Sequence, residues 1–312
     1  MNRREFNKAL GISTVVFASG AINFSSAKPA PQIALTMDDF AWNNAIKLSP
    51  EQRNEAILGT LQKYSVKAAL FVMGRMIDNE RGKHLLAKWD KAGHLIANHT
   101  YSHRDYNSAT MTAGVYEEDI LRAEGLLKEF PQFKKYIRFP MLKEGDTALK
   151  RDAIRKSLAQ HGYQMGYVTI DNSDWVIDMR LRARLEKDPD TKVDAYRDFY
   201  LEHMWDRAQY YDALAHKVLG RSVKHTISTH FNLLNALFME DLMKMFKSKG
   251  WQWIDAQEAL SDPVFTTLPK IVPAGESIIW ALAKESGEIP KELRYPAEDG
   301  EYETARMNKL GL

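Results

Sequence analysis

The sequence predicts an α/β fold in which parallel strands alternate with helices around a barrel. Short apolar runs alternate with amphipathic segments along most of the chain, the pattern of successive βαβ units. The 312 residues, 45% of them hydrophobic, can bury one large core. Polar residues also follow the apolar runs repeatedly, and in a β/α barrel the ends of the strands meet on the face that carries the active site.

Seven strands and five helices are predicted in alternation. The helix at 113–130 is predicted because Tyr116, Ile120 and Leu127 recur at helical spacing. Gly162 directly follows the helix at 146–161, as expected at a helix end. The predicted strands are 33–37, 67–73, 93–98, 136–139, 164–170, 223–229 and 251–254. The predicted helices are 50–64, 83–91, 113–130, 146–161 and 234–249.

A polar and aromatic segment at about 176–221 interrupts this alternation, and its spacing is helical. It carries the aromatic residues Tyr196, Tyr200, Trp205, Tyr210 and Tyr211. Two interpretations are open: an extra pair of helices that packs over the barrel, or a wall of a substrate cleft. We expect the barrel with this insertion to span 28–262, and 263–312 to form a C-terminal extension packed on it.

The composition of residues 1–27 indicates an export signal. Arg3-Arg4 with Phe6 and Lys8 resembles a bacterial twin-arginine signal, and small residues at 25–27 allow cleavage. The uncharged stretch 9–24 is too short and too rich in Gly and Ser for a membrane-spanning helix. We therefore expect an exported bacterial protein, periplasmic or extracellular, with no stable membrane insertion after cleavage. A chance basic start and an uncleaved anchor are the alternatives.

Composition excludes several classes of site. The chain has no cysteine, so any metal must bind to histidine and carboxylate side chains. The net charge is +2, and removing residues 1–27 would leave the chain formally neutral. No basic patch or RNA-binding motif is present, and nucleic acid is not an expected partner. No Gly-x-Ser-x-Gly elbow is present either, which disfavours a serine hydrolase.

Asp38-Asp39 follows the first predicted strand, and His99 and His103 follow the third. Two adjacent carboxylates at the end of a buried strand are costly unless a cation or hydrogen-bond donors hold them. One Asp and two His form a three-ligand set with room for water, as in catalytic zinc sites. The second Asp would then be free to act as a base. The purely structural alternatives are a turn or a helix cap at Asp38-Asp39, and histidines without a ligand role.

Three further strand ends carry chemistry-bearing residues. Arg138 could hold a carboxylate and keep it ionised, with a surface salt bridge as the alternative. Asp174 could orient a histidine ring and Trp175 could form the floor of a pocket, with a loop cap and a packed Trp as the alternative. His230 ends the strand at 223–229.

Together these residues resemble the five ordered motifs of the polysaccharide deacetylases, carbohydrate esterase family four, over about 33–260. The motifs are Thr36-Met-Asp-Asp39, His99-Thr-Tyr-Ser-His103, Arg138-Phe-Pro140, Asp171-Asn-Ser-Asp-Trp175 and His230. The resemblance implies a distorted (β/α) barrel, here of about seven parallel strands with a helical insertion. It also implies hydrolysis of N- or O-linked acetyl groups on a polysaccharide or oligosaccharide, with a divalent metal: zinc first, then Co²⁺, Ni²⁺ or Mn²⁺.

Carried over by position, the resemblance assigns a role to each motif residue. Asp38 would be the base and His230 the acid, with Arg138 orienting Asp38 and Asp174 pairing with His230. The implied metal ligands are Asp39, His99 and His103, and the implied substrate-binding residues are Phe40, Pro140 and Trp175. The chain departs from the family at Met37 (usually Phe), Phe40 (usually a small residue) and Ser228 (usually aliphatic).

Two other functions remain open at this point. One is a non-catalytic carbohydrate-binding protein on the same scaffold, with Phe40 and the aromatics of the insertion stacking on sugars. The other is a hydrolase of small linear amides. The sequence leaves the identity of the glycan, the metal and the oligomeric state open.

Overall fold

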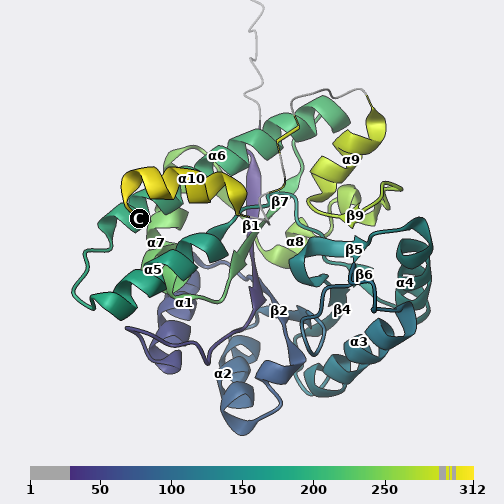
Figure 1. Cartoon of the computed structure of the whole chain (residues 1–312), viewed down its shortest axis with the longest axis horizontal. Coiled ribbons are helices and arrows are strands. Elements are labelled where there is room, and N and C mark those ends of the chain that lie inside the picture. Colours follow the sequence, from purple (N-terminus) through teal and green to yellow (C-terminus); the bar gives the residue numbers. More distant parts are fainter. Residues whose placement is uncertain (1–28, 288–292, 295, 297–299) are drawn as a thin grey trace, which may run out of the picture.

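The protein is built on a curled parallel sheet with helices around it, as the computed structural model in Figure 1 shows. The structure describes residues 29–287, 293, 294, 296 and 300–312, so the predicted export signal at 1–27 lies outside the described residues. The seven strands of the sheet are β1 (Gln32–Asp39), β2 (Ala69–Val72), β3 (Leu95–Asn98), β4 (Phe133–Ile137), β6 (Gln164–Met165), β7 (Lys224–His230) and β8 (Gln252–Trp253). The predicted α/β class and distorted barrel are confirmed.

The sheet runs in the order β6-β4-β3-β2-β1-β7, and β8 pairs with the first two residues of β1. All of these pairings are parallel. Beyond β6, at one edge, Ile170 bridges to Ile227 of β7, at the other edge. Residues 166–170 therefore join the two edges of the curled sheet. The strand predicted over 164–170 is much shorter in the structure: β6 covers only Gln164–Met165, and Ile170 forms an isolated bridge.

Helices surround the sheet, and several begin where the sequence predicts. Ser49 and Gln52 form a capping box that starts α1 at Pro50. Thr112, Thr147 and Asn232 accept hydrogen bonds from the first turns of α3, α4 and α7. The helices are α1 (Pro50–Tyr64), α2 (Glu80–Lys91), α3 (Ala113–Leu127), α4 (Ala148–Gln160), α5 (Asp174–Lys187), α6 (Asp194–Leu219), α7 (Leu233–Ser248), α8 (Ala256–Ala259), α9 (Ile278–Ser286) and α10 (Glu301–Leu310). Three short 3₁₀ turns are η1 (Gly74–Met76), η2 (Pro140–Leu142) and η3 (Pro263–Thr266).

The insertion forms two helices, α5 and α6. Helix α6 packs against α7 and α9, and its five predicted aromatics are buried or partly buried in the core. Of the two interpretations, the first, in which the insertion packs over the barrel, therefore holds for α6. Only the start of α5 contributes a residue, Trp175, to the main cavity described below.

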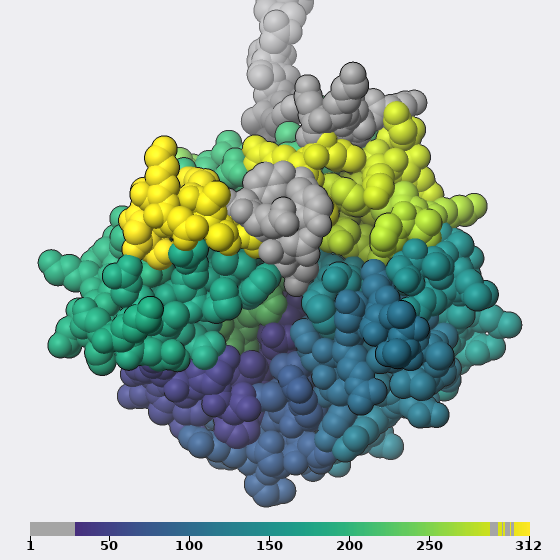
Figure 2. All heavy atoms as spheres, viewed as in Figure 1, coloured from purple at the N-terminus to yellow at the C-terminus, as the bar shows by residue number. Residues whose placement is uncertain are grey.

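The C-terminal extension has more structure than the sequence predicts. Helix α9 packs on α6, and α10 packs on α5. A short strand, β9 (Ala274–Gly275), pairs antiparallel with β5 (Lys143–Gly145). In Figure 2 the yellow C-terminal residues lie on the same side of the molecule as the green residues of the insertion. Among the described residues, no helix is long and apolar enough to cross a membrane.

Gly166, directly after β6, packs against the ring of Phe71. A Cβ atom added there would lie 2.3 Å from the Phe71 ring, whereas one added at Gly59, on the exposed side of α1, meets nothing within 4 Å. We expect Gly166→Ala to lower the free energy of unfolding by about 1–3 kcal/mol through overpacking. The matched control Gly59→Ala should raise it by roughly 0.5–1 kcal/mol through helix propensity. Urea denaturation measures both, and equal effects of the two substitutions would contradict this account.

Candidate functional site

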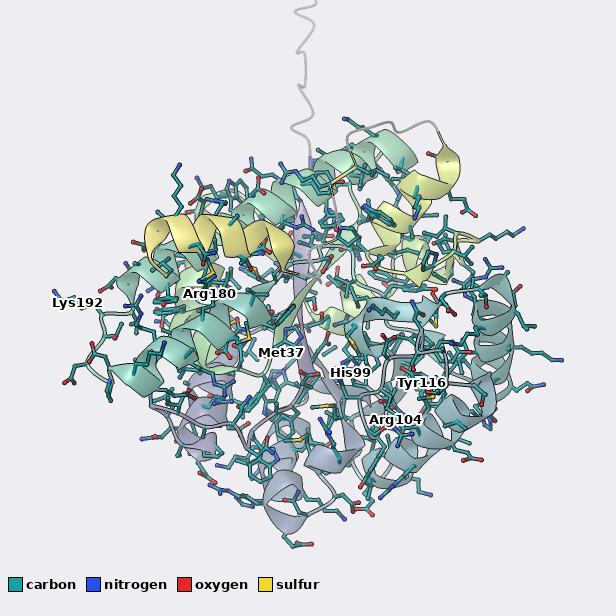
Figure 3. All side chains as sticks on the ribbon, viewed as in Figure 1. Met37, His99, Arg104, Tyr116, Arg180 and Lys192 are labelled. Carbon is teal, nitrogen blue, oxygen red and sulfur yellow. The ribbon has the colours of Figure 1, made fainter. Side chains whose placement is uncertain are left out.

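The ends of the strands bring most of the predicted site residues into one cavity. The pairing of β1 with β7 sets Asp38 opposite His230, and that of β3 with β4 sets Asn98 opposite Ile137. His99 and Arg138, the residues directly after these two strands, therefore leave the sheet side by side. Figure 3 shows Met37 and His99 near the centre of the molecule, whereas Lys192 points outward.

The cavity has a volume of about 390 Å³. In Figure 2 a hollow opens in this face of the molecule, with the purple end of β1 at its floor. Six predicted residues line the cavity: Asp38, Asp39, His99, His103, Trp175 and His230. Its other lining residues are Phe139, Met141, Leu142 and Lys143.

The backbone at the end of β1 brings both aspartates to the cavity. Successive strand residues normally point to opposite faces of a sheet, but Asp39 has a φ of 74° and Phe40 a φ of 56°. This left-handed turn ends the alternation, and both carboxylates line the cavity. The same turn sends Phe40 into the core, where its ring is fully buried and packs 4.8 Å from the Phe231 ring. The expected substrate contact of Phe40 is therefore wrong, because its ring does not reach the cavity.

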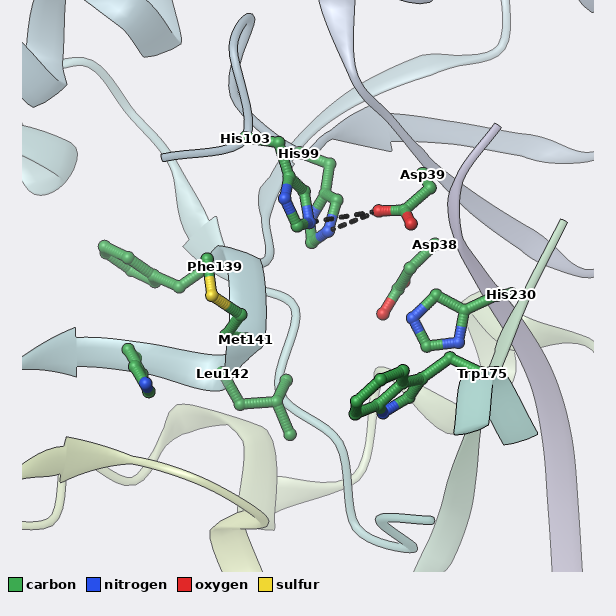
Figure 4. Close-up of a pocket in the computed structure, with 10 residues that line it drawn as sticks. Asp38, Asp39, His99, His103, Phe139, Met141, Leu142, Trp175 and His230 are labelled. Carbon is green, nitrogen blue, oxygen red and sulfur yellow. Dashed lines mark ion pairs between the residues drawn. The ribbon is translucent and has the colours of Figure 1, made fainter. Parts of the chain in front are cut away.

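Asp39, His99 and His103 form a candidate metal site (Figure 4). Oδ1 of Asp39 lies 3.1 Å from Nε2 of His103 and 3.4 Å from Nε2 of His99. Ligands about 2.1 Å from a tetrahedral zinc ion are separated by about 3.4 Å, so this spacing fits one cation. Burial raises the pKa of Asp39, but the imidazoles of His103 and His99 outweigh it and hold that pKa well below its usual range. The carboxylate is thus ready to bind a cation.

Hydrogen bonds fix the two imidazoles in this orientation. Nδ1 of His99 lies 2.9 Å from the carbonyl oxygen of Arg138, which leaves Nε2 to face Asp39. The backbone N–H of His103 donates to Oγ1 of Thr100 at 3.0 Å. Asp119 of α3 accepts hydrogen bonds from the N–H groups of Tyr101 and Ser102. The loop that carries the histidines is therefore anchored to a helix rather than free to move.

Asp38 is buried beside the guanidinium group of Arg138 and the hydroxyl group of Ser228. Nη1 of Arg138 donates to Oδ1 of Asp38 at 2.7 Å, and Oγ of Ser228 donates to Oδ2 at 3.3 Å. Arg138 also donates to the carbonyl oxygen of Gly166 at 2.8 Å and stacks on Phe71, 3.9 Å from the ring centre. The structure thus brings Arg138 to Asp38, and it adds Ser228, a departure from the family pattern, as a second donor.

His230 pairs with the fully buried Asp174, and the two are called the acid pair below. Oδ1 of Asp174 lies 2.6 Å from Nδ1 of His230, and Oδ2 accepts hydrogen bonds from the backbone N–H of His230 and from the side-chain amides of Asn232 and Asn235. Burial lowers the pKa of His230, but the negative charge of Asp174 outweighs it, with further contributions from Asp39 and Asp38. The pKa of His230 is therefore raised well above its usual value.

The wall opposite Trp175 is the part of the site that sequence analysis missed. Met141 and Leu142 line it with left-handed backbone, φ 54° and 53°. The N–H of Glu276, just after β9, donates to the carbonyl oxygen of Leu142 at 2.9 Å and holds this loop. Pro140 is buried and does not line the cavity. The position of Arg138-Phe-Pro140 at a strand end was the available signal, but it did not indicate which neighbours face the cavity.

Comparison with known proteins identifies the family. The family model described as "Polysaccharide deacetylase" matches residues 25–166. This part of the chain belongs to the polysaccharide deacetylases. A peptidoglycan-N-acetylglucosamine deacetylase of Bacillus cereus is 27% identical over 156 residues, 50% of this chain and 50% of that protein. A second protein of the same name and organism is 30% identical over 108 residues, 35% of this chain and 46% of that protein. The chain thus spans about half the length of the curated relatives it matches.

Two of the solved structures that resemble this chain share its fold. A mutant of a CE4-family pseudoenzyme with restored enzymatic activity has a TM-score of 0.52 and 17% identity, covering 75% of this chain and 69% of that chain. A polysaccharide deacetylase from Bacillus cereus has a TM-score of 0.51 and 18% identity, covering 72% of this chain and 91% of that chain.

The geometry of the Asp39–His99–His103 set predicts one site for a divalent cation, and zinc is the first to test. We expect the metal-free chain to bind one zinc ion, and Asp39→Ala and His103→Ala each to lower the affinity by at least about 100-fold, since loss of a ligand should cost no less than loss of an outer partner. His161→Ala is the control, because His161 pairs with Glu117 on the surface. Calorimetric titration with zinc measures the affinity, and unchanged binding in both ligand variants would contradict the assignment.

The charge of Asp174 should set the titration of His230. His230 is protonated below its pKa, so a lowered pKa means that the ring loses its proton at lower pH. We expect Asp174→Asn to lower the midpoint by at least about one pH unit, measured by NMR of the ring protons. Asp212→Asn is the matched control, since Asp212 is the partner of the buried His225. An unmoved His230 midpoint in Asp174→Asn would show that Asp174 does not hold the proton.

Proposed function

We propose that this protein is a metal-dependent hydrolase that removes acetyl groups from a glycan. One observation carries the proposal: a buried carboxylate, Asp38, and a carboxylate-paired imidazole, His230, line the same cavity as the Asp39–His99–His103 set. These three parts are what hydrolysis of an acetyl amide or ester requires: a base, an acid and ligands for a cation. Figure 4 shows Asp38 between the candidate ligands and His230.

Asp38 is the proposed general base. A divalent cation, most commonly zinc, would polarise the acetyl carbonyl and lower the pKa of water. Oδ1 of Asp38 accepts from Arg138, and Oδ2 accepts only a long, 3.3 Å hydrogen bond from Ser228. Oδ2 is therefore the oxygen better able to take a proton from water as it attacks the carbonyl carbon.

His230 is the proposed general acid. Its Nδ1 faces Asp174, so the other ring nitrogen, Nε2, is the one that can donate a proton to the departing amine or alkoxide. The raised pKa of His230 favours the protonated ring, which is the form that a general acid needs. The imidazole and Asp38 can thus perform opposite proton transfers in one turnover, although both side chains lie in one cavity.

We infer that the substrate is an acetylated glycan, with N-acetylglucosamine of peptidoglycan as the first to test. Both curated relatives are named for that activity. A second hollow of about 190 Å³, lined in part by Asn44 and Arg182, shares Asp39, Trp175 and His230 with the main cavity. The space therefore continues past the reacting centre, which suits a glycan better than a small linear amide. An exported protein, as residues 1–27 predict, would meet such a substrate outside the cytoplasm.

The lining of the main cavity gives little support to the non-catalytic carbohydrate-binding alternative. That alternative depends on stacking by Phe40 and by the aromatics of the insertion. Phe40 is fully buried, and Tyr196, Tyr200 and Tyr211 are each no more than 2% exposed. None of these rings lines the cavity.

Loss of either proton-transfer group should slow turnover without loss of the metal. We expect Asp38→Asn and His230→Ala each to lower kcat for acetate release from an N-acetylglucosamine oligosaccharide by about 10²–10⁴-fold. Bound zinc, measured in each variant, should match the wild type, because neither residue belongs to the ligand set. His84→Ala, on the surface-facing side of α2, is the control. Undiminished acetate release by both variants would refute the mechanism.

A further inference from the structure

A polar stripe on the buried side of α6 faces the loop that carries Asp174. Tyr200, His203 and Arg207 are separated by three and four residues, so they lie on one face of the helix. Each of the three is no more than 3% exposed. Buried polar groups are costly unless they are hydrogen-bonded, and their partners therefore indicate what the stripe does.

Each member of the stripe bonds to the Asp171–Asp174 loop or to a group that holds Asp174. Nε of Arg207 donates to the carbonyl oxygen of Asp171 at 3.0 Å. Nε2 of His203 accepts from the backbone N–H of Ser173 at 3.0 Å. The Tyr200 hydroxyl donates to Asn235 at 2.6 Å, and Asn235 donates to Oδ2 of Asp174 at 2.7 Å. The insertion thus contacts the acid pair indirectly, through the backbone before Asp174 and through Asn235.

The hydrogen bond from Ser173 reveals which tautomer of His203 is present. A backbone N–H can only donate, so Nε2 of His203 must be an acceptor and the ring proton must be on Nδ1. Nδ1 lies 3.2 Å from Oε1 of Glu303, a residue of α10 that is 3% exposed. Burial, and then the charge of Arg207, lower the pKa of His203 to about 3, in agreement with a neutral ring.

We propose that His203 and Glu303 are positioning residues for the acid pair. Glu303 keeps the proton on Nδ1 of His203, Nε2 of His203 holds the N–H of Ser173, and the next residue, Asp174, is thereby aimed at His230. The kinetic part of this inference rests on the proposed function, since it takes His230 as the general acid. The structural part, the orientation of Asp174 toward His230, does not.

Glu303 offers the sharper pair of variants. In Glu303→Leu the ring proton of His203 loses its acceptor, so Nε2 can carry the proton and then opposes the Ser173 N–H. In Glu303→Gln the amide oxygen can still accept from Nδ1. We expect kcat for acetate release by the zinc-loaded full chain to fall about 10- to 100-fold in Glu303→Leu, with KM unchanged. Glu303→Gln should restore the wild-type kcat.

His203 gives a second pair in case Glu303→Leu fails to fold. The side-chain oxygen of Gln can occupy the place of Nε2, so His203→Gln retains the acceptor for Ser173, and His203→Leu loses it. The control is His94→Leu. His94 is also buried and also accepts from a backbone N–H, that of Ala68 at 3.0 Å, but it lies before β3, at the other end of the strands. It should lower thermal stability and leave kcat unchanged.

A spectroscopic measurement separates this inference from the proposed function. The Nδ1 proton of His230, assigned by its absence in His230→Ala, should resonate far downfield because of the 2.6 Å contact with Asp174. We expect the signal to move upfield or vanish in Glu303→Leu and His203→Leu, and to persist in Glu303→Gln, His203→Gln and His94→Leu. A wild-type signal in both Leu variants would overturn the inference. An inactive wild type with the expected NMR pattern would refute the proposed function alone.

Discussion

Two neighbouring carboxylates at the end of β1 constrain the arrangement of the rest of the site. Bringing Asp38 and Asp39 to one cavity takes a left-handed backbone at Asp39 and Phe40, which costs on the order of 1–3 kcal/mol per residue. It also sets two like charges side by side. Each carboxylate therefore has its own partners: Arg138 for Asp38, and two imidazoles for Asp39. Burial of Phe40 against Phe231 stabilises the turn itself.

The sequence predicts the order of the elements and the composition of the site because both follow local rules. Strand ends converge in a parallel barrel, so polar residues after five apolar runs had to meet. Phe40 was misplaced because only the backbone turn reveals which way its ring points. Met141 and Leu142 were missed because the contact that fixes their loop comes from residue 276, and no local pattern near 140 reports it. Ser228 stood out as a departure, but its hydrogen bond to Asp38 depends on the β1–β7 register.

The proposed catalytic groups divide between two parts of the chain. The family match at 25–166 contains Asp38, Asp39, His99, His103 and Arg138, but neither Asp174 nor His230. The acid pair, Asp174 and His230, lies after residue 166, in the part of the chain that contains α5, α6, α7 and α10. One solved structure with this fold is a mutant of a pseudoenzyme, so the fold alone does not establish turnover. In the proposed mechanism, turnover depends on whether the second part presents the acid pair correctly to the first.

The pairing of β5 with β9 limits how far this protein can be truncated from its C-terminus. Arg151 of α4 donates to the carbonyl oxygen of Lys270, and Arg155 donates to that of Pro269 at 2.8 Å, beside the strand pair. The cavity wall formed by Met141 and Leu142 thus depends on residues 269–276, beyond the boundary at 262 that the sequence suggests. A fragment ending at 262 would keep every side chain proposed as catalytic, but it would lose the residues that support the cavity wall at Met141 and Leu142. The smallest unit worth expressing on its own therefore extends well past the last strand of the barrel.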